Sequence, residues 1–137
     1  MRHICLLALL FIAVQASPAT TPAKHPCKTP QIAPNCYWAH GRLSVYNGGY
    51  PNFRLWRIGT NRMMGIWNSP WDYAHRDQMV LEDEDDNFPA NIETLKINFL
   101  QVNLFGDFEV CPLEPLKPAA RQAACIAAAK HLVTKPY

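Results

Sequence analysis

The feature that most restricts the fold of this chain is a set of four cysteines that follows an apolar leader. Residues 1–16 have a basic start, an apolar run of eleven residues and small residues at positions 14 and 16, as expected of a signal peptide. The leader contains Cys5, and the chain beyond it keeps Cys27, Cys36, Cys111 and Cys125. An even set of cysteines in an exported protein predicts two disulfides, because compartments outside the cytosol are oxidising.

Four cysteines allow three pairings, and the predicted elements favour one of them. Cys111 ends a predicted strand and Cys125 lies in a predicted helix, so a bond between them would join helix to sheet across a loop of about 15 residues and contribute about 3 kcal/mol. Cys27 and Cys36 then form the second pair, at the edge of the domain. The expected bonds are therefore Cys111–Cys125 and Cys27–Cys36.

The rest of the chain divides into an arm and one domain. Residues 17–34 are rich in Pro, Thr and Ala and contain five prolines, which predicts a flexible arm. Residues 35–137 form a single β-rich domain of ordinary size. No stretch after the leader approaches the roughly 18 apolar residues of a membrane-spanning helix, so we expect no transmembrane segment in the mature form. Its nearly balanced charge also argues against a nucleic-acid partner.

Alternating residues between positions 41 and 67 predict a three-stranded antiparallel meander. The expected strands are Arg42–Tyr46, Phe53–Ile58 and Met63–Trp67. Asn47-Gly48-Gly49 and residues 59–61 supply the turns between them.

The second half of the chain predicts a long loop, two more strands and a helix. Residues 68–91 form a polar loop that contains the acidic run 82–86. Leu95–Leu104 and Phe108–Cys111 are expected strands, separated by a turn at residues 105–107. Pro118 and the alanines after it predict a helix over Ala119–Val133. The expected fold is mainly β, a small antiparallel sandwich or partly open barrel with one C-terminal helix.

Three segments of the chain resemble a family of small exported bacterial proteins of uncharacterised function. They read GRLSVYNG from Gly41, FRLWRIGTNR from Phe53 and FGDFEVCP from Phe105. The resemblance implies a shared fold and an exported location. It carries no known activity, cofactor or catalytic residue.

Local motifs for catalysis or metal binding are not found in the sequence. The acidic run begins like a calcium loop but lacks the glycine of the sharp turn, so a solvated loop is expected. The histidines show neither HxH nor HExxH spacing, and Ser44 or Ser69 with His40 and Asp107 lacks the elbow motif of a serine hydrolase. We therefore expect no cofactor and no metal.

Aromatic residues give the strongest indication of binding. Trp56 lies between Arg54 and Arg57 on one predicted strand, and Tyr46 lies on the strand before it. Exposed Trp and Tyr beside Arg can stack on sugars or form the centre of a protein interface. The candidate binding surface is therefore Trp56, Arg54, Arg57 and Tyr46.

The alternative is a structural role for the same residues. Trp56 would then belong to the core or its rim, and the arginines would pair with Asp107 and Glu109 on a neighbouring strand. The leading functional hypothesis is an exported, non-catalytic binding or interaction module of the cell envelope or extracellular space, with a protein or glycan partner. A small secreted enzyme with a site assembled from distant residues, and an inhibitor or immunity-type protein that presents residues 68–91, are the alternatives.

Overall fold

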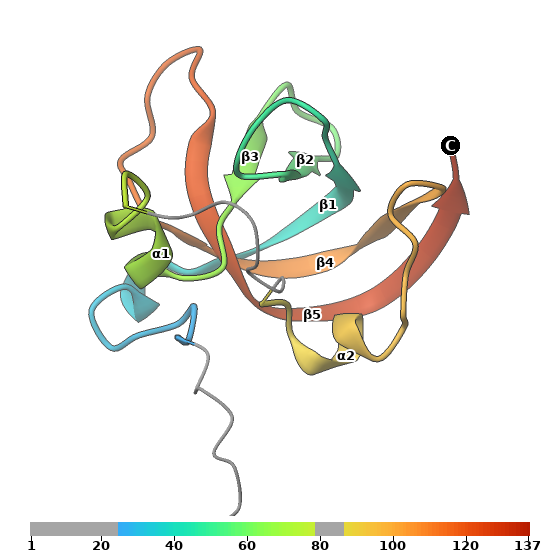
Figure 1. Ribbon diagram of the computed structural model, residues 1–137, viewed down its shortest axis with the longest axis horizontal. Helices are drawn as coiled ribbons and strands as arrows, with labels where there is room; N and C mark the ends of the chain where they lie inside the picture. The colour runs from blue at the N-terminus through green and yellow to red at the C-terminus, as the bar shows by residue number, and fades with distance from the viewer. Residues whose placement is uncertain (1–24, 79–86) are drawn as a thin grey trace, which may run out of the picture.

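The computed structural model describes residues 25–78 and 87–137 (Figure 1). The predicted signal peptide, the first part of the predicted arm and the acidic run 82–86 lie outside these residues. None of the helices that the structure describes has the length and apolar character needed to cross a membrane.

Among the described residues, five strands and three short helices make up the domain. The strands are β1 (Tyr37–Val45), β2 (Phe53–Arg57), β3 (Met63–Ile66), β4 (Val102–Pro112) and β5 (Gln122–Pro136). The helices are the 3-10 helix η1 (Ala33–Asn35), α1 (Pro70–Ala74) and α2 (Ala90–Glu93). Figure 1 shows β4 and β5 as two long, curved strands side by side, with the start of β4 beside the C-terminal end of β5.

The strands form one sheet that closes into a barrel in the order β1-β2-β3-β5-β4, with β4 paired back to β1. All neighbouring strands are antiparallel except β3 and β5, which are parallel. The mainly β prediction is confirmed. The wholly antiparallel arrangement is wrong, because the chain crosses from β3 to β4 before β5 returns alongside β3.

The predicted meander is confirmed as β1, β2 and β3. Leu43 pairs with Leu55, and Leu55 pairs in turn with Met64. All three side chains are at most 2% exposed, so each strand turns alternate residues into the barrel. Gly41 lets β1 approach β2, since a Cβ there would lie 2.7 Å from Leu55 Cδ1.

The turn predicted at residues 105–107 is wrong, because β4 continues through it. Pairing with β5 shifts between Phe105 and Asp107, which marks a bulge. Gly106 allows the strands to approach there, because a Cβ would lie 2.7 Å from Leu132 Cδ2 and 3.0 Å from the Lys130 carbonyl oxygen. The start of the strand predicted over Leu95–Leu104 is also wrong, since β4 begins only at Val102.

The predicted C-terminal helix is wrong, and the alanine-rich segment is strand β5. Ala123 and Ala124 are buried, and β5 pairs along most of its length with β4. Alanine favours a helix in isolation, but propensity is a weak prior that pairing and burial override. Small side chains also suit this strand, because Ala129 lies opposite the bulky Phe108 of β4.

The chain forms two disulfides, but neither predicted pairing is correct. The bonds are Cys27–Cys125 and Cys36–Cys111. Cys111 and Cys125 are directly opposite each other on β4 and β5, and each bonds to the N-terminal segment instead. This segment also contacts β4 through Lys28, whose Nζ lies 2.5 Å from Glu109 Oε1. The second half of the predicted arm is thereby attached to the barrel.

Candidate functional site

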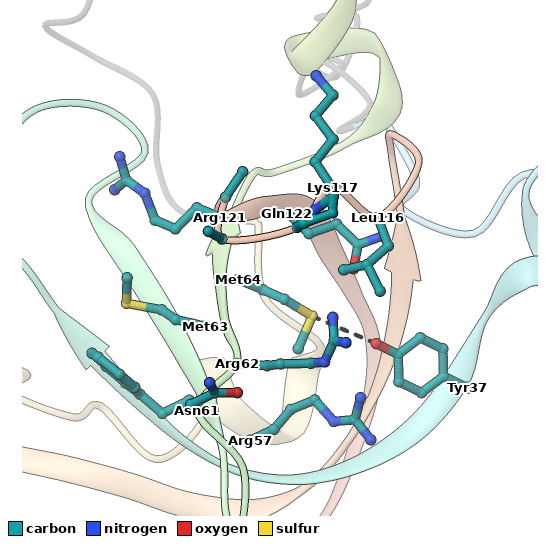
Figure 2. A pocket seen from close by; sticks show the side chains of 14 residues that line it. Tyr37, Arg57, Asn61, Arg62, Met63, Met64, Leu116, Lys117, Arg121 and Gln122 are labelled. Atoms are coloured by element: carbon teal, nitrogen blue, oxygen red, sulfur yellow. Dashed lines mark hydrogen bonds between the residues drawn. The ribbon is translucent and has the colours of Figure 1, made fainter.

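A cavity of about 370 Å³ opens at one end of the barrel (Figure 2). We call it the mouth cavity. It lies between the turn that joins β2 to β3 (residues 58–62) and the loop that joins β4 to β5 (residues 113–121). The lining residues are Tyr37, Trp56, Arg57, Asn61, Arg62, Met63, Met64, Leu116, Lys117, Pro118, Ala119, Ala120, Arg121 and Gln122.

The base of the mouth cavity belongs to the apolar core. Met64 is 2% exposed, and its Sδ accepts a hydrogen bond from the Tyr37 hydroxyl at 3.8 Å. Gln122 contributes an amide at the wall, where its Nε2 donates to the Glu114 carbonyl oxygen at 3.0 Å. The cavity therefore combines an apolar base with polar groups above it, the usual composition of a small-molecule site.

Four cationic side chains line this cavity: Arg57, Arg62, Lys117 and Arg121. Figure 2 shows Arg57 and Arg62 extending in the same direction, toward Tyr37. The Arg57 guanidinium lies 5.4 Å from the centre of the Tyr37 ring. Within the part of the chain that the structure describes, no Asp or Glu lines the cavity and neither Arg57 nor Arg62 has a carboxylate partner.

The structure divides the four predicted binding residues between two places. Trp56 and Arg57 line the mouth cavity, and Trp56 is half-buried, with the Arg42 guanidinium 5.7 Å from its ring. Arg54 is only 6% exposed and lies 5.1 Å from the ring of the exposed Tyr46. Neither Arg54 nor Tyr46 lines the cavity. The cavity therefore brings together two of the four predicted residues, Trp56 and Arg57.

The predicted pairing of the arginines with Asp107 and Glu109 is wrong. Asp107 accepts hydrogen bonds from His131 Nδ1 at 2.7 Å and from His40 Nδ1 at 2.8 Å. These bonds, the one from His131 first, lower the pKa of the Asp107 carboxyl. Glu109 pairs with Lys28. Asp107 and Glu109 therefore bind two histidines and Lys28, and neither pairs with Arg54 or Arg57 within the described residues.

Neither candidate nucleophile joins the His40–Asp107 pair. The Ser44 hydroxyl is buried and donates to Asn103 Oδ1 at 2.5 Å. Ser69 caps α1 and bonds the Asp72 carboxylate. Within residues 25–78 and 87–137, no group of three or more His, Cys, Asp or Glu side chains is positioned to hold a metal ion.

Glu114 fixes the loop that forms one wall of the mouth cavity. Its carboxylate accepts a hydrogen bond from the Ala123 amide at 2.8 Å and another from the Tyr73 hydroxyl at 2.8 Å. The bond from Ala123 is the largest cause that lowers the pKa of Glu114, and the Tyr73 hydroxyl, Lys117 and Arg76 act in the same direction against partial burial. Burial first, and then the bond to Glu114, raise the pKa of Tyr73.

We expect Glu114→Gln to destabilise the protein by about 2 kcal/mol at pH 7, because the amide offers one neutral acceptor oxygen in place of the two charged oxygens of the carboxylate. The folded-state pKa lies below the ordinary value of 4.5, so the stabilisation is present above that value and is lost as the pH falls through the folded pKa. Denaturant unfolding between pH 3 and pH 7 measures it. A difference between variant and native protein that stayed constant over this range would contradict the assignment.

Sequence reasoning missed the contribution of Arg62, Lys117 and Arg121 to the site. Arg62 lies at a turn, and Lys117 and Arg121 belong to a loop whose end falls within the helix predicted over Ala119–Val133. A cluster of unpaired cations in turns was the available signal, but only the closure of the barrel brings residues 57–64 next to residues 116–122. Comparison with known protein families, curated proteins and solved structures gave no match.

Proposed function

We propose that this protein is an exported, non-catalytic binding protein whose mouth cavity takes an anionic group of its ligand. The observation that carries the proposal is the position of Arg57 and Arg62, which line one cavity, extend toward Tyr37 and have no carboxylate partner among the described residues. Two guanidinium groups in a partly enclosed space repel each other, and a bound anion would offset this repulsion.

The chemistry of the lining supports an organic anion. Arginine presents a planar fork that matches carboxylate, phosphate or sulfate oxygens, and the amides of Asn61 and Gln122 can add neutral hydrogen bonds. Met63 and Leu116 supply apolar surface beside these groups. A ligand that carries a negative charge on an organic body would satisfy both parts of the cavity.

Export is supported by the two disulfides, since such bonds persist mainly outside the cytosol. The arrangement of the strands supports binding at this place by analogy. A closed five-stranded barrel with two short helices between β3 and β4 is similar to the OB fold, in which strands 2 and 3 and the loop between strands 4 and 5 bind ligands. Fold similarity alone does not define a function, so the proposed binding site is defined by the side chains of the cavity.

Arg57→Gln and Arg62→Gln are each expected to weaken binding of a small organic anion by about tenfold or more, because each removes a charge-assisted hydrogen bond. The measurement is an NMR titration of the protein with galacturonate, phosphate and sulfate, which gives affinity and location together. Lys96→Gln is the charge-matched control, since Lys96 is exposed and does not line the cavity.

We expect chemical-shift changes at residues 57–64 and 113–122 in the native protein and in Lys96→Gln. If none of the three anions shifts these residues, or if Lys96→Gln weakens binding as much as Arg57→Gln, the proposed function is wrong.

A further inference from the structure

A line of aromatic and cationic side chains crosses the outer face of the barrel from the lip of the mouth cavity. Its members are Trp56 on β2, Arg42 on β1, Phe105 on β4 and Lys135 on β5, and we call them the outer row. Arg42 pairs with Trp56 on one side and with Phe105 on the other. Trp56 also lines the mouth cavity, so the row and the cavity are continuous.

The register shows that the outer row points away from the core. Leu43 follows Arg42, Leu104 precedes Phe105, and both leucines pair with each other and are fully buried. Side chains alternate between the two faces of a strand, so Arg42 and Phe105 face outward. Lys135 reaches the same face, because its Nζ lies 5.0 Å from the centre of the Phe105 ring.

The cations of the outer row are held by aromatic rings and not by acidic groups. The Arg42 guanidinium lies 5.7 Å from the Trp56 ring, and its buried Nε has no hydrogen-bond partner among the described residues. Within residues 25–78 and 87–137, neither Arg42 nor Lys135 takes part in a salt bridge. Their positive charge is therefore not neutralised by the described part of the protein.

A second row on the same outer face, formed by Trp38 of β1, Asp107 and Glu109 of β4 and Lys130 of β5, also places a cation against an aromatic ring. Lys130 lies 4.2 Å from the ring of Trp38, which is 46% exposed. The acidic groups of this row, Asp107 and Glu109, are engaged by two histidines and by Lys28. Within the described part of the chain, the outer face of β1, β4 and β5 thus carries more cationic than acidic side chains, together with the exposed ring of Trp38.

We infer that the ligand is a linear acidic polysaccharide, with one anionic group in the mouth cavity and the next ones along the outer row. The inference rests on the proposed function, which supplies the first contact. The row spans three strand spacings, or about 14 Å, enough for several charged groups of one extended chain. The positive charges of the row suit sugar rings that carry carboxylate or sulfate groups.

A single-stranded nucleic acid fits the outer row less well. Proteins that bind it offer open aromatic faces for base stacking, whereas cations already lie against Trp56, Phe105 and Trp38. The disulfides also favour a compartment in which polysaccharides are the common polyanions.

The test compares galacturonate with its α-1,4-linked hexamer by isothermal titration calorimetry. The hexamer is expected to bind at least tenfold more tightly than the monomer, because it alone reaches the outer row. The double variant Arg42→Gln/Lys135→Gln should lose about fivefold to tenfold in hexamer affinity and keep the affinity for the monomer. Lys96→Gln is again the matched control, and an unchanged thermal melt shows that each variant is folded.

Equal affinity for monomer and hexamer would overturn the inference, as would a double variant that binds the hexamer like the native protein. The inferred ligand would instead be a nucleic acid if an eight-nucleotide oligothymidylate bound as tightly as the hexamer and lost the same affinity in the double variant. If hexamer binding depends on Arg42 and Lys135 but not on Arg57, the outer row binds the polysaccharide and the proposed role of the mouth cavity is wrong.

Discussion

Replacing Cys27 and Cys125 with alanine is expected to lower the free energy of unfolding by about 3.5 kcal/mol, and the Cys36→Ala/Cys111→Ala variant is expected to lose a similar amount. Replacing all four cysteines should remove about 8 kcal/mol in total. Small domains are stable by only about 5–15 kcal/mol, so the variant without cysteines should be largely unfolded near 37 °C.

The two double variants are expected to lose the same free energy of unfolding because one disulfide is nested inside the other. Cys27–Cys125 spans 98 residues and encloses Cys36–Cys111, which spans 75. Once either bond is present, the other closes a ring made only of segments 27–36 and 111–125, and a ring of about 25 residues contributes about 3.5 kcal/mol. Only the first bond to form restricts a long loop.

Denaturant unfolding of the two double variants, each purified without reductant, measures the two losses. Peptide mapping under non-reducing conditions supplies the control, because the native protein must yield Cys27 linked to Cys125. If one double variant were as stable as the native protein, the bond it lacks would not constrain the unfolded chain as the nested arrangement requires.

The strands of the meander could be predicted because their local signals agree. Alternation places Leu43 and Leu55 on one face, and glycine turns separate the strands at short distances. Each signal depends on residues close in sequence, so no knowledge of the remaining chain was needed. The mainly β class follows from the same pattern.

The β5 strand could not be predicted because distant residues determine it. Residues 119–133 contain many alanines and no alternation strong enough to oppose a helix. Their strand conformation depends on pairing with β4 and on the parallel contact of residues 122–124 with β3. The disulfide error has the same origin, since it assumed a helix around Cys125.

The candidate site was predicted only in part for a related reason. Trp56 and Arg57 were visible because they are adjacent in an aromatic segment, and both line the mouth cavity. Arg62 and Arg121 are separated by almost 60 positions, and only closure of the barrel brings them together. Arg54 is buried and its guanidinium lies 5.1 Å from the Tyr46 ring, a contact that an alternation pattern does not reveal.

Phe108→Ala is expected to destabilise the protein by about 4 kcal/mol, because Phe108 is fully buried and large-to-small changes leave a cavity. Its partners on the two neighbouring strands are Ala39 and Ala129, which are too small to fill the space left by the ring. Urea unfolding of the variant measures the loss, and Leu100→Ala, at a position that is 70% exposed, is the control.

The size of this loss also tests why β5 is rich in alanine. If small residues on β1 and β5 exist to make room for the Phe108 ring, then enlarging one of them should partly compensate for the missing ring. Phe108→Ala/Ala129→Leu should therefore recover at least about 1 kcal/mol relative to Phe108→Ala, while Ala129→Leu alone should destabilise by overpacking. If the loss of stability in the double variant equals the sum of the losses in Phe108→Ala and Ala129→Leu, then Phe108 and Ala129 do not share one space in the barrel.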